Sequence, residues 1–283
     1  MALQLIEDAL GDPRNATALA LASDLSYLPQ AEAAVAFQEQ LGLDALLISV
    51  DNIQVYVAQN DDHIVAVFRG TEAPTTIEGL KDWLLTDALN LLIVPEGRLG
   101  TDFIAAGVGA RFHQGFMTGL AAIWDPLEAA IKAEIARKDR PFWITGHSLG
   151  GALATLSAWL FDRKFYSVHQ VYTYGAPMIG NDIASAAIDK AFPKKIYRYV
   201  NGPDPVPKLP TMSLVANDYS HCLEEIALGP AEAAVSTTEM FQRIAARTLA
   251  GEILDDLWKS VLSRVSAHGL DNYRKLLKEH FEK

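Results

Sequence analysis

Hydrophobic and polar positions follow two repeating patterns along this chain. Apolar residues recur at helical spacing over residues 17–41, 116–137, 152–165 and 182–191. Short runs typical of strands lie at 45–50, 53–58, 63–68, 141–145, 170–174 and 195–200. The turn signal Asn60-Asp61-Asp62 separates two of these runs, so they predict an antiparallel hairpin.

The order of these elements predicts the fold class. After residue 116, strands alternate with helices, which is the pattern of a parallel sheet covered by helices. We therefore expect one α/β domain over residues 1–283, with a mostly parallel central sheet, helices on both faces and an antiparallel edge hairpin. The last third lacks a strand pattern, and residues 238–266 show apolar positions near helical spacing, which predicts an amphipathic helix packed on the sheet.

Charge and composition exclude several classes of partner. The formal net charge of -11 argues against nucleic acid, which needs clustered Lys and Arg, and against electrostatic adhesion to anionic lipid. One cysteine, Cys222, permits no internal disulfide. No window approaches the roughly 18 apolar residues of a membrane span, and the first residues lack the basic start of a signal peptide. We expect a cytoplasmic location, or export by a leaderless route.

The segment Gly146-His147-Ser148-Leu149-Gly150 matches G-x-S-x-G between a predicted strand and a predicted helix. In that context the turn is so tight that Gly146 and Gly150 have no room for side chains, and Ser148 has a strained backbone conformation. Ser148 is then the expected nucleophile. A phosphate-binding loop would need G-x-G-x-x-G or a following lysine, and neither is present. The motif therefore favours nucleophilic catalysis.

A serine nucleophile needs an acid, and this fold class places it after the serine in the chain. Asp204 follows the predicted strand 195–200 directly, between Pro203 and Pro205, which limit its movement. Asp182 and Asp189 lie on a predicted helix further from a strand end. Asp204 is therefore the favoured acid.

The serine also needs a base, and three histidines follow it. His280 lies in a charged terminal tail, while His221 follows Asp204 closely. His268 precedes a glycine and is expected on a loop, where catalytic side chains concentrate. The pattern favours His268 and leaves His221 open.

Five motifs together resemble the class 3 lipases, the fungal-type group within the α/β-hydrolases. They are F-R-G-T (68–71), H-Q-G-F (113–116), I-T-G-H-S-L-G-G-A-L-A (144–154), Y-G-A-P-M-I-G-N (174–181) and N-G-P-D-P-V-P-K-L-P (201–210). The resemblance implies an α/β-hydrolase fold with Ser148, Asp204 and His268 as catalytic triad. It implies a supporting role for His147 and a structural one for His221, and it implies no metal or cofactor.

The resemblance also implies an oxyanion hole and a lid. Thr71 and Leu149 would hold the oxyanion. A lid is expected at about 74–96, with side chains facing the site from Ile77, Leu80, Trp83 and Leu84. Two features depart from the family pattern. Residues 91–111 form a longer apolar, glycine-bearing run, and Ala267 stands where the family has an aspartate. Tyr273, a few residues after His268, stands where the family has a tyrosine.

These observations predict a serine carboxylic-ester hydrolase, a triacylglycerol lipase or esterase that works through an acyl-enzyme. The expected partner is a small-molecule lipid or ester substrate, met at a lipid–water interface. Phospholipase A1, feruloyl-type esterase and acyltransferase activities use the same chemistry. A lipase-like interaction module without catalysis is the alternative from another class. The sequence leaves acyl-chain preference and oligomeric state open.

Overall fold

The computed structural model describes residues 4–70, 91–208, 219–223, 225–229 and 265–281. Several predictions of the sequence fall outside these residues. They concern the oxyanion residue Thr71, the lid residues Ile77, Leu80, Trp83 and Leu84, and most of the predicted helical segment 238–266.

A seven-stranded sheet forms the centre of the fold, in the order β1-β2-β3-β6-β7-β9-β11. The strands are β1 (Asp44–Val50), β2 (Ile53–Gln59), β3 (Ile64–Phe68), β6 (Phe142–His147), β7 (Val168–Tyr174), β9 (Ile196–Asn201) and β11 (Glu225–Leu228). β1, β2 and β3 are antiparallel neighbours, and every pairing from β3 to β11 is parallel. The predicted parallel sheet with an antiparallel edge hairpin is confirmed. The prediction that the last third has no strand is wrong, because β11 is too short to show a periodic pattern.

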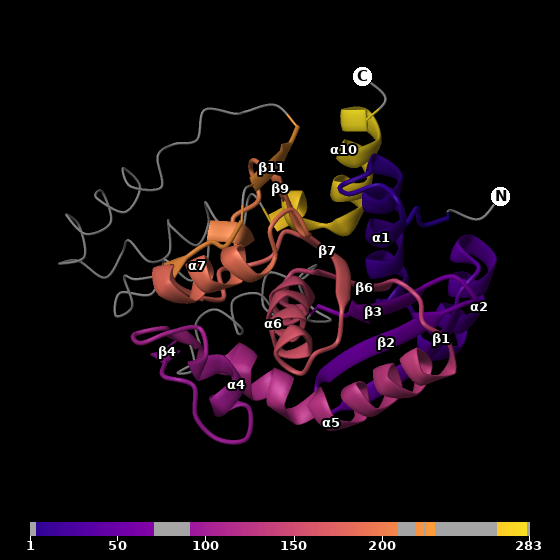
Figure 1. The fold of residues 1–283 in the computed structure, drawn as a ribbon. Coiled ribbons are helices and arrows are strands. Elements are labelled where there is room, and N and C mark those ends of the chain that lie inside the picture. The colour runs from indigo at the N-terminus through magenta and orange to yellow at the C-terminus, as the bar shows by residue number, and fades with distance from the viewer. Residues whose placement is uncertain (1–3, 71–90, 209–218, 224, 230–264, 282–283) are drawn as a thin grey trace.

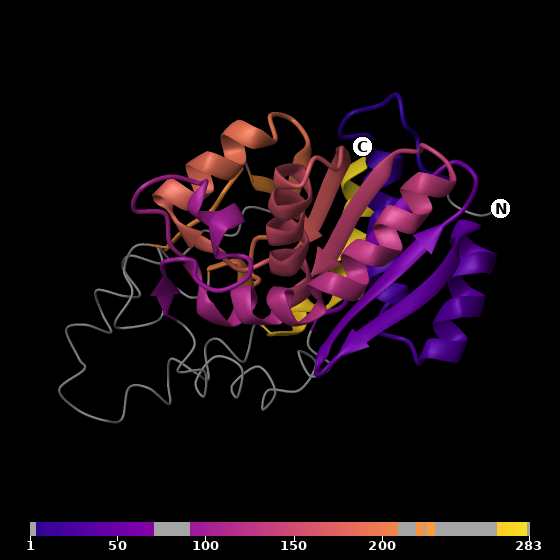
Figure 2. The ribbon, with the colours of Figure 1, turned by 60° about the horizontal axis from the view of Figure 1, so that its bottom comes forward.

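Helices cover both faces of this sheet (Figures 1 and 2). On one face lie α1 (Pro13–Leu25), α2 (Gln30–Leu41) and α10 (Leu270–Phe281), whose buried side chains form one hydrophobic cluster with the sheet. On the other face α5 (Gln114–Arg137) and α6 (Leu149–Arg163) belong to a second cluster, joined by α4 (Gly100–Ile104) and α7 (Asp182–Ala191).

Two helical predictions need correction. The single pattern over 17–41 is two helices, because Pro29 disfavours helical backbone at the residue before it and α2 begins at Gln30. The segment around His280 is not a tail but the end of α10. Leu270, Tyr273 and Leu277 of that helix are buried at helical spacing against α1, so an otherwise charged segment docks on the core.

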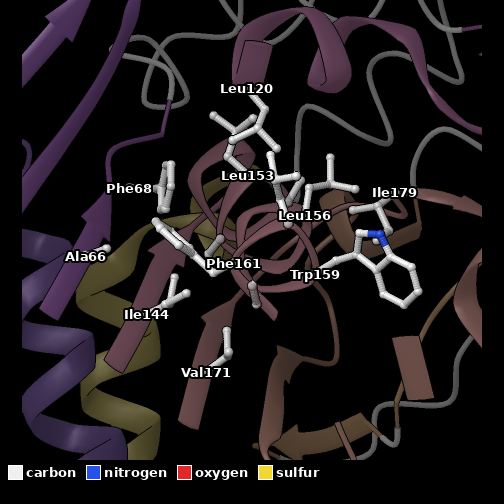
Figure 3. Close-up of a cluster of buried hydrophobic side chains, with 14 of the residues drawn as sticks. Ala66, Phe68, Leu120, Ile144, Leu153, Leu156, Trp159, Phe161, Val171 and Ile179 are labelled. Atoms are coloured by element: carbon white, nitrogen blue, oxygen red, sulfur yellow. The ribbon is translucent and has the colours of Figure 1, made fainter. Parts of the chain in front are cut away.

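The core beneath α6 holds the start of that helix against the sheet (Figure 3). Leu153 and Leu156 of α6 are fully buried beside Ile144 of β6 and Phe68 of β3. Truncating one such leucine to alanine typically costs about 2–5 kcal/mol. The register of α6 on the sheet is therefore strongly specified, and with it the position of the turn that precedes the helix.

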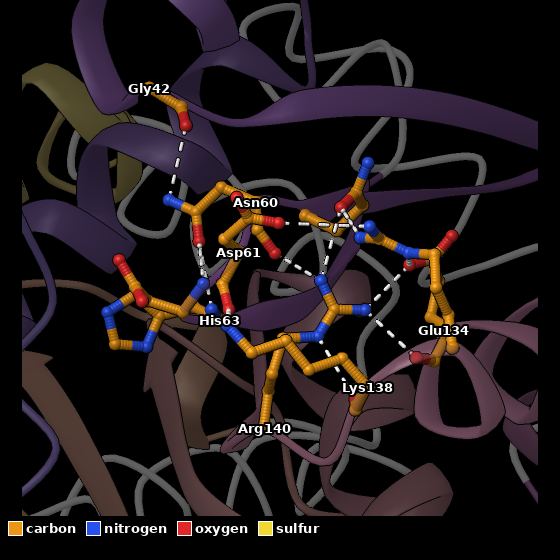
Figure 4. Close-up of polar contacts among 10 residues, drawn as sticks. Gly42, Asn60, Asp61, His63, Glu134, Lys138 and Arg140 are labelled. Carbon is orange, nitrogen blue, oxygen red and sulfur yellow. Dashed lines mark hydrogen bonds and ion pairs between the residues drawn. The ribbon is translucent and has the colours of Figure 1, made fainter.

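At the end of the central strands opposite the serine turn, the buried Arg140 precedes β6 and contacts several neighbouring segments (Figure 4). Its guanidinium donates to the Glu134 carboxylate at 2.7 Å and to the carbonyl of Asn60, and its Nε donates to the Lys138 carbonyl at 3.3 Å. These contacts join the end of α5 to the β2–β3 turn. They fix where β6 begins, at the far end from the G-x-S-x-G turn.

A second, four-stranded sheet lies beyond the carboxyl ends of the central strands, in the order β10-β8-β5-β4. Its strands are β4 (Leu92–Ile93), β5 (Phe112–His113), β8 (Gly180–Asn181) and β10 (Tyr219–Ser220). Two short 3-10 turns complete the described elements, η1 (Val206–Lys208) and η2 (Val265–His268). Within the described ranges, no helix has the length and apolar character needed to span a bilayer.

Candidate active site

Ser148 occupies the turn between β6 and α6 with φ 57° and ψ -131°. A β-carbon at Gly146 would lie 2.3 Å from the Gly150 carbonyl oxygen, and one at Gly150 would lie 2.2 Å from the Phe68 carbonyl oxygen. Both positions therefore exclude any side chain, as the sequence predicted. The Ser148 N–H donates to the Tyr174 carbonyl at 3.0 Å, which ties the turn to the end of β7. A non-glycine residue at positive φ is held there by its surroundings.

His268 and Asp204 form a buried pair, with exposed fractions of 1% and 0%. His268 Nδ1 donates to Asp204 Oδ2 at 2.8 Å, and Asp204 Oδ1 accepts from the Val206 N–H at 2.9 Å. His221 is elsewhere engaged: its Nε2 donates to the Pro207 carbonyl, and burial lowers the pKa of His221 to about 4. The structure thus joins Asp204 to the histidine that the motif pattern favoured.

Tyr273 is the third member of this cluster, and the sequence pattern alone assigned it no role. Its hydroxyl donates to Asp204 Oδ2 at 2.6 Å and accepts from the Asn201 N–H at 3.1 Å. The Asn201 side chain donates to the Ala267 carbonyl at 2.9 Å. Asp204 and the chain before His268 are thereby connected through the end of β9 and the first turn of α10.

Gly175 shows how close this pair lies to the serine turn. It follows Tyr174, whose carbonyl accepts from the Ser148 N–H. A β-carbon at Gly175 would lie 2.8 Å from Asp204 Oδ2 and 3.0 Å from His268 Nδ1, at φ 59°. Only glycine leaves room for the imidazole there; Gly175 belongs to the Y-G-A-P-M-I-G-N motif, but the motif alone did not predict this role. His268 Nε2 is buried and has no hydrogen-bond partner within the part of the chain described, so no other described group occupies this nitrogen.

His147 supports the position of His268. Its Nε2 donates to the His268 carbonyl at 2.8 Å, so in the neutral ring Nδ1 accepts the hydrogen bond from the Tyr27 hydroxyl at 2.9 Å. The two imidazoles lie 4.5 Å apart between ring centroids. Complete burial, and then the nearby His268, hold the pKa of His147 well below its usual value. Because both of its nitrogens are engaged, His147 has no free nitrogen for proton transfer.

One of the two expected oxyanion donors lies in the described residues. α6 begins at Leu149, so its N–H belongs to the first helical turn, where N–H groups lack intrahelical acceptors. Thr71 is outside the described residues, but the residue before it is not. A β-carbon at Gly70 would lie 3.3 Å from Ser148 Cβ and 2.8 Å from the His147 carbonyl oxygen. The F-R-G-T segment therefore passes directly beside the serine at Gly70.

The described part of the chain contains no group of three or more His, Cys, Asp or Glu side chains placed to hold a metal ion. The groups near the serine turn are the alcohol of Ser148, the imidazole of His268 and the carboxylate of Asp204, at the carboxyl ends of the central strands. Their arrangement suits proton transfer and nucleophilic attack.

A family model described as "Lipase (class 3)" matches residues 65–214, which is just over half of the chain. The chain belongs to the class 3 lipase family. This match confirms the resemblance carried by the five motifs. It covers the serine, the acid and the F-R-G-T segment, and it ends before the histidine.

Two curated relatives of this class 3 lipase domain come from fungi. One is secreted mono- and diacylglycerol lipase 1 of Fusarium solani, 36% identical over 151 residues, covering 51% of this chain and 42% of that protein. The other is secreted mono- and diacylglycerol lipase 3 of Gibberella zeae, 30% identical over 143 residues, covering 49% of this chain and 42% of that protein. The chain thus spans less than half the length of these relatives. The predicted cytoplasmic location is wrong on this finding, because both relatives are named as secreted.

Solved structures show the same fold. A triacylglycerol lipase whose catalytic centre is described as a serine protease triad is 21% identical, with a TM-score of 0.58. The alignment covers 75% of this chain and 78% of that one. At this identity the likeness establishes the α/β-hydrolase fold.

Proposed function

We propose that this protein is a serine ester hydrolase that cleaves lipid esters through a covalent acyl-enzyme. The observation that carries the proposal is the buried His268–Asp204 pair, joined by a hydrogen bond of 2.8 Å between Nδ1 and Oδ2. This pair lies at the carboxyl ends of the central strands, where Ser148 is held in a strained turn. The class 3 lipase membership and the acylglycerol lipase names of the relatives support acylglycerols as the substrate class.

In the proposed acylation step, Ser148 Oγ attacks the ester carbonyl carbon while His268 Nε2 takes the hydroxyl proton. Asp204, bonded to Nδ1, orients the ring and stabilises the imidazolium. The carbonyl oxygen becomes an oxyanion held by the Leu149 N–H and Thr71. When the tetrahedral intermediate collapses, the ester C–O bond breaks and His268 returns the proton to the leaving alcohol.

Deacylation repeats the same proton transfers with water. His268 Nε2 removes a proton from water as the water oxygen attacks the acyl carbon. When this second tetrahedral intermediate collapses, the bond between the acyl carbon and Ser148 Oγ breaks and His268 returns the proton to Oγ. The products are a carboxylic acid and the free enzyme. His147 keeps the His268 backbone in place throughout, because its Nε2–H stays bonded to the His268 carbonyl.

The test is Ser148→Ala, compared with Ser157→Ala as matched control. Ser157 is a fully buried serine of α6 whose hydroxyl bonds to the Ala154 carbonyl, away from the triad. We expect Ser148→Ala to lose at least about 10³-fold in hydrolysis of a nitrophenyl ester and to lose labelling by a fluorophosphonate probe. Ser157→Ala should retain both. Wild-type turnover in Ser148→Ala would refute the nucleophile, and absence of labelling in the wild type would favour a non-catalytic interaction module.

A substrate panel tests the lipid assignment separately. Monoacyl-, diacyl- and triacylglycerols, phosphatidylcholine and a feruloyl ester are compared at equal acyl-bond concentration. We expect the highest kcat/KM on an acylglycerol. A maximum on two-carbon esters, with none beyond eight carbons, would contradict a lipase.

A further inference from the structure

Asn201 is the last residue of β9, and the loop that carries the acid Asp204 follows it. The residue is buried, with an exposed fraction of 5%. In an Asn-Gly turn the asparagine side chain commonly bonds to the backbone of its own turn. Here its Nδ2 donates instead to the carbonyl of Ala267 at 2.9 Å, 66 positions further along the chain. The side chain thus joins two segments of the candidate active site.

Two backbone contacts connect Asn201 to the acid. Its carbonyl accepts from the Asp204 N–H at 2.9 Å, which fixes the acid's own backbone. Its N–H donates to the Tyr273 hydroxyl at 3.1 Å, and that hydroxyl donates to Asp204 Oδ2 at 2.6 Å. β9 lies between β7 and β11 in the central sheet, so Asn201 belongs to a strand with neighbours on both sides. The acid is therefore positioned from a fixed point.

The side-chain contact acts on the base. A peptide unit is planar, so holding its carbonyl orients the whole unit. Two such units meet at the α-carbon of His268. Asn201 holds the preceding unit at the Ala267 carbonyl, and His147 holds the following one at the His268 carbonyl at 2.8 Å. Holding both units fixes φ and ψ of His268, and with them the direction in which its side chain leaves the backbone.

The chemistry of this contact requires a donor at position 201. The partner is a carbonyl oxygen, which only accepts, so the amide nitrogen of Asn201 must face it. A carboxylate in its place would have no proton to donate, and it would lie close to the negative charge of Asp204. An alanine would remove the donor without adding a charge. These two replacements should therefore affect the site to different degrees.

We propose that Asn201 is a positioning residue that sets the acid and the base relative to each other. Its backbone fixes Asp204, and its side-chain amide fixes the backbone at His268. This role rests on the proposed function, because it assigns Asn201 to the same proton-transfer pair. Asn201 acts through these two residues and not on the substrate, so its loss should lower kcat and leave KM unchanged.

The test compares Asn201→Asp and Asn201→Ala with Asn15→Asp as matched control. Asn15 is a fully buried asparagine whose Nδ2 donates to the Ile6 carbonyl at 2.9 Å, so its replacement puts the same carboxylate against a different carbonyl. On a soluble nitrophenyl ester at about pH 8.5, kcat should fall about tenfold in Asn201→Ala and about 100-fold in Asn201→Asp, with KM within about twofold of wild type. Asn15→Asp should keep its kcat. Urea unfolding measures the stability that each variant loses.

A pH profile tests the donated hydrogen bond itself. The titratable groups around Asn201 are Asp204 and His268, Tyr273 of α10, and Glu225 of β11, whose charge acts on Tyr273. Burial and the charge of Asp204 should raise the pKa of the new carboxyl in Asn201→Asp. Once protonated, that carboxyl can donate again. Relative to wild type, the kcat of Asn201→Asp should therefore rise about tenfold from about pH 8.5 to about pH 6, while that of Asn201→Ala stays level.

Three outcomes overturn the proposal. The first is wild-type kcat in both Asn201 variants. The second is an equal kcat loss in Asn201→Asp and Asn15→Asp once the folded fraction is taken into account, or a loss confined to stability or KM. The third is a kcat deficit in Asn201→Asp that does not change with pH. Failure of the proposed function would look different, because the wild type itself would neither hydrolyse the ester nor react with a fluorophosphonate probe.

Discussion

The hydroxyl of Tyr273 offers the sharpest test of how the buried acid is held. Tyr273→Phe removes one oxygen atom and leaves the ring packed against the core. Two hydrogen bonds disappear: the one donated to Asp204 Oδ2 at 2.6 Å and the one accepted from the Asn201 N–H at 3.1 Å. Asp204 keeps its bonds to His268 and Val206.

The magnitude follows from these two contacts. A hydrogen bond to a charged acceptor contributes about 2 kcal/mol, and an orphaned buried N–H costs about 1–3 kcal/mol. Because the two share one hydroxyl, we expect a combined loss of about 3 kcal/mol in the free energy of unfolding. Looser orientation of the acid should also lower kcat by about tenfold, or ~1.4 kcal/mol in the activation barrier.

Tyr174→Phe is the matched control for this change. Tyr174 is also fully buried, but its hydroxyl donates to the Ala16 carbonyl and not to Ser148, Asp204 or His268. It should lose about 1 kcal/mol of stability and keep its kcat. Urea unfolding and nitrophenyl ester hydrolysis, measured on both variants, separate the effects. Wild-type kcat in Tyr273→Phe, or an equal kcat loss in Tyr174→Phe, would refute the positioning role.

Two further predictions concern buried histidines and the glycine at the site. Burial lowers the pKa of both His113 and His221 to about 4, so below pH 6.5 the unfolded chain takes up protons first and stability falls. Between pH 7.5 and pH 5, each histidine should lower the free energy of unfolding by about 2 kcal/mol, measured by urea unfolding. In His221→Asn the loss over this pH range should be smaller by about that amount. A flat stability profile would contradict this. Gly175→Ala places a methyl group against Asp204 and His268, so kcat should fall at least about tenfold while the far-ultraviolet spectrum is kept. Unchanged kcat would mean that the site relaxes freely.

The sequence by itself determined the central features of this protein. The alternation of strands and helices after residue 116 specified a parallel sheet, because apolar period and element length are local properties. The spacing of Gly146, Ser148 and Gly150 specified the turn for a comparable reason. Steric exclusion at Gly146 involves only the backbone of the same turn, whereas at Gly150 it also involves the Phe68 carbonyl of β3, and the structure has both of the β-carbon clashes that the motif implies.

Other features are decided by tertiary structure. Choosing His268 over His221 as partner of Asp204 depends on where α10 docks, since 64 positions separate the two paired residues. The docking of α10, the pairing of β11 with β9 and the space kept by Gly175 arise from contacts between distant segments. No local pattern encodes such contacts, because the energy that selects them comes from burying side chains of both partners at once.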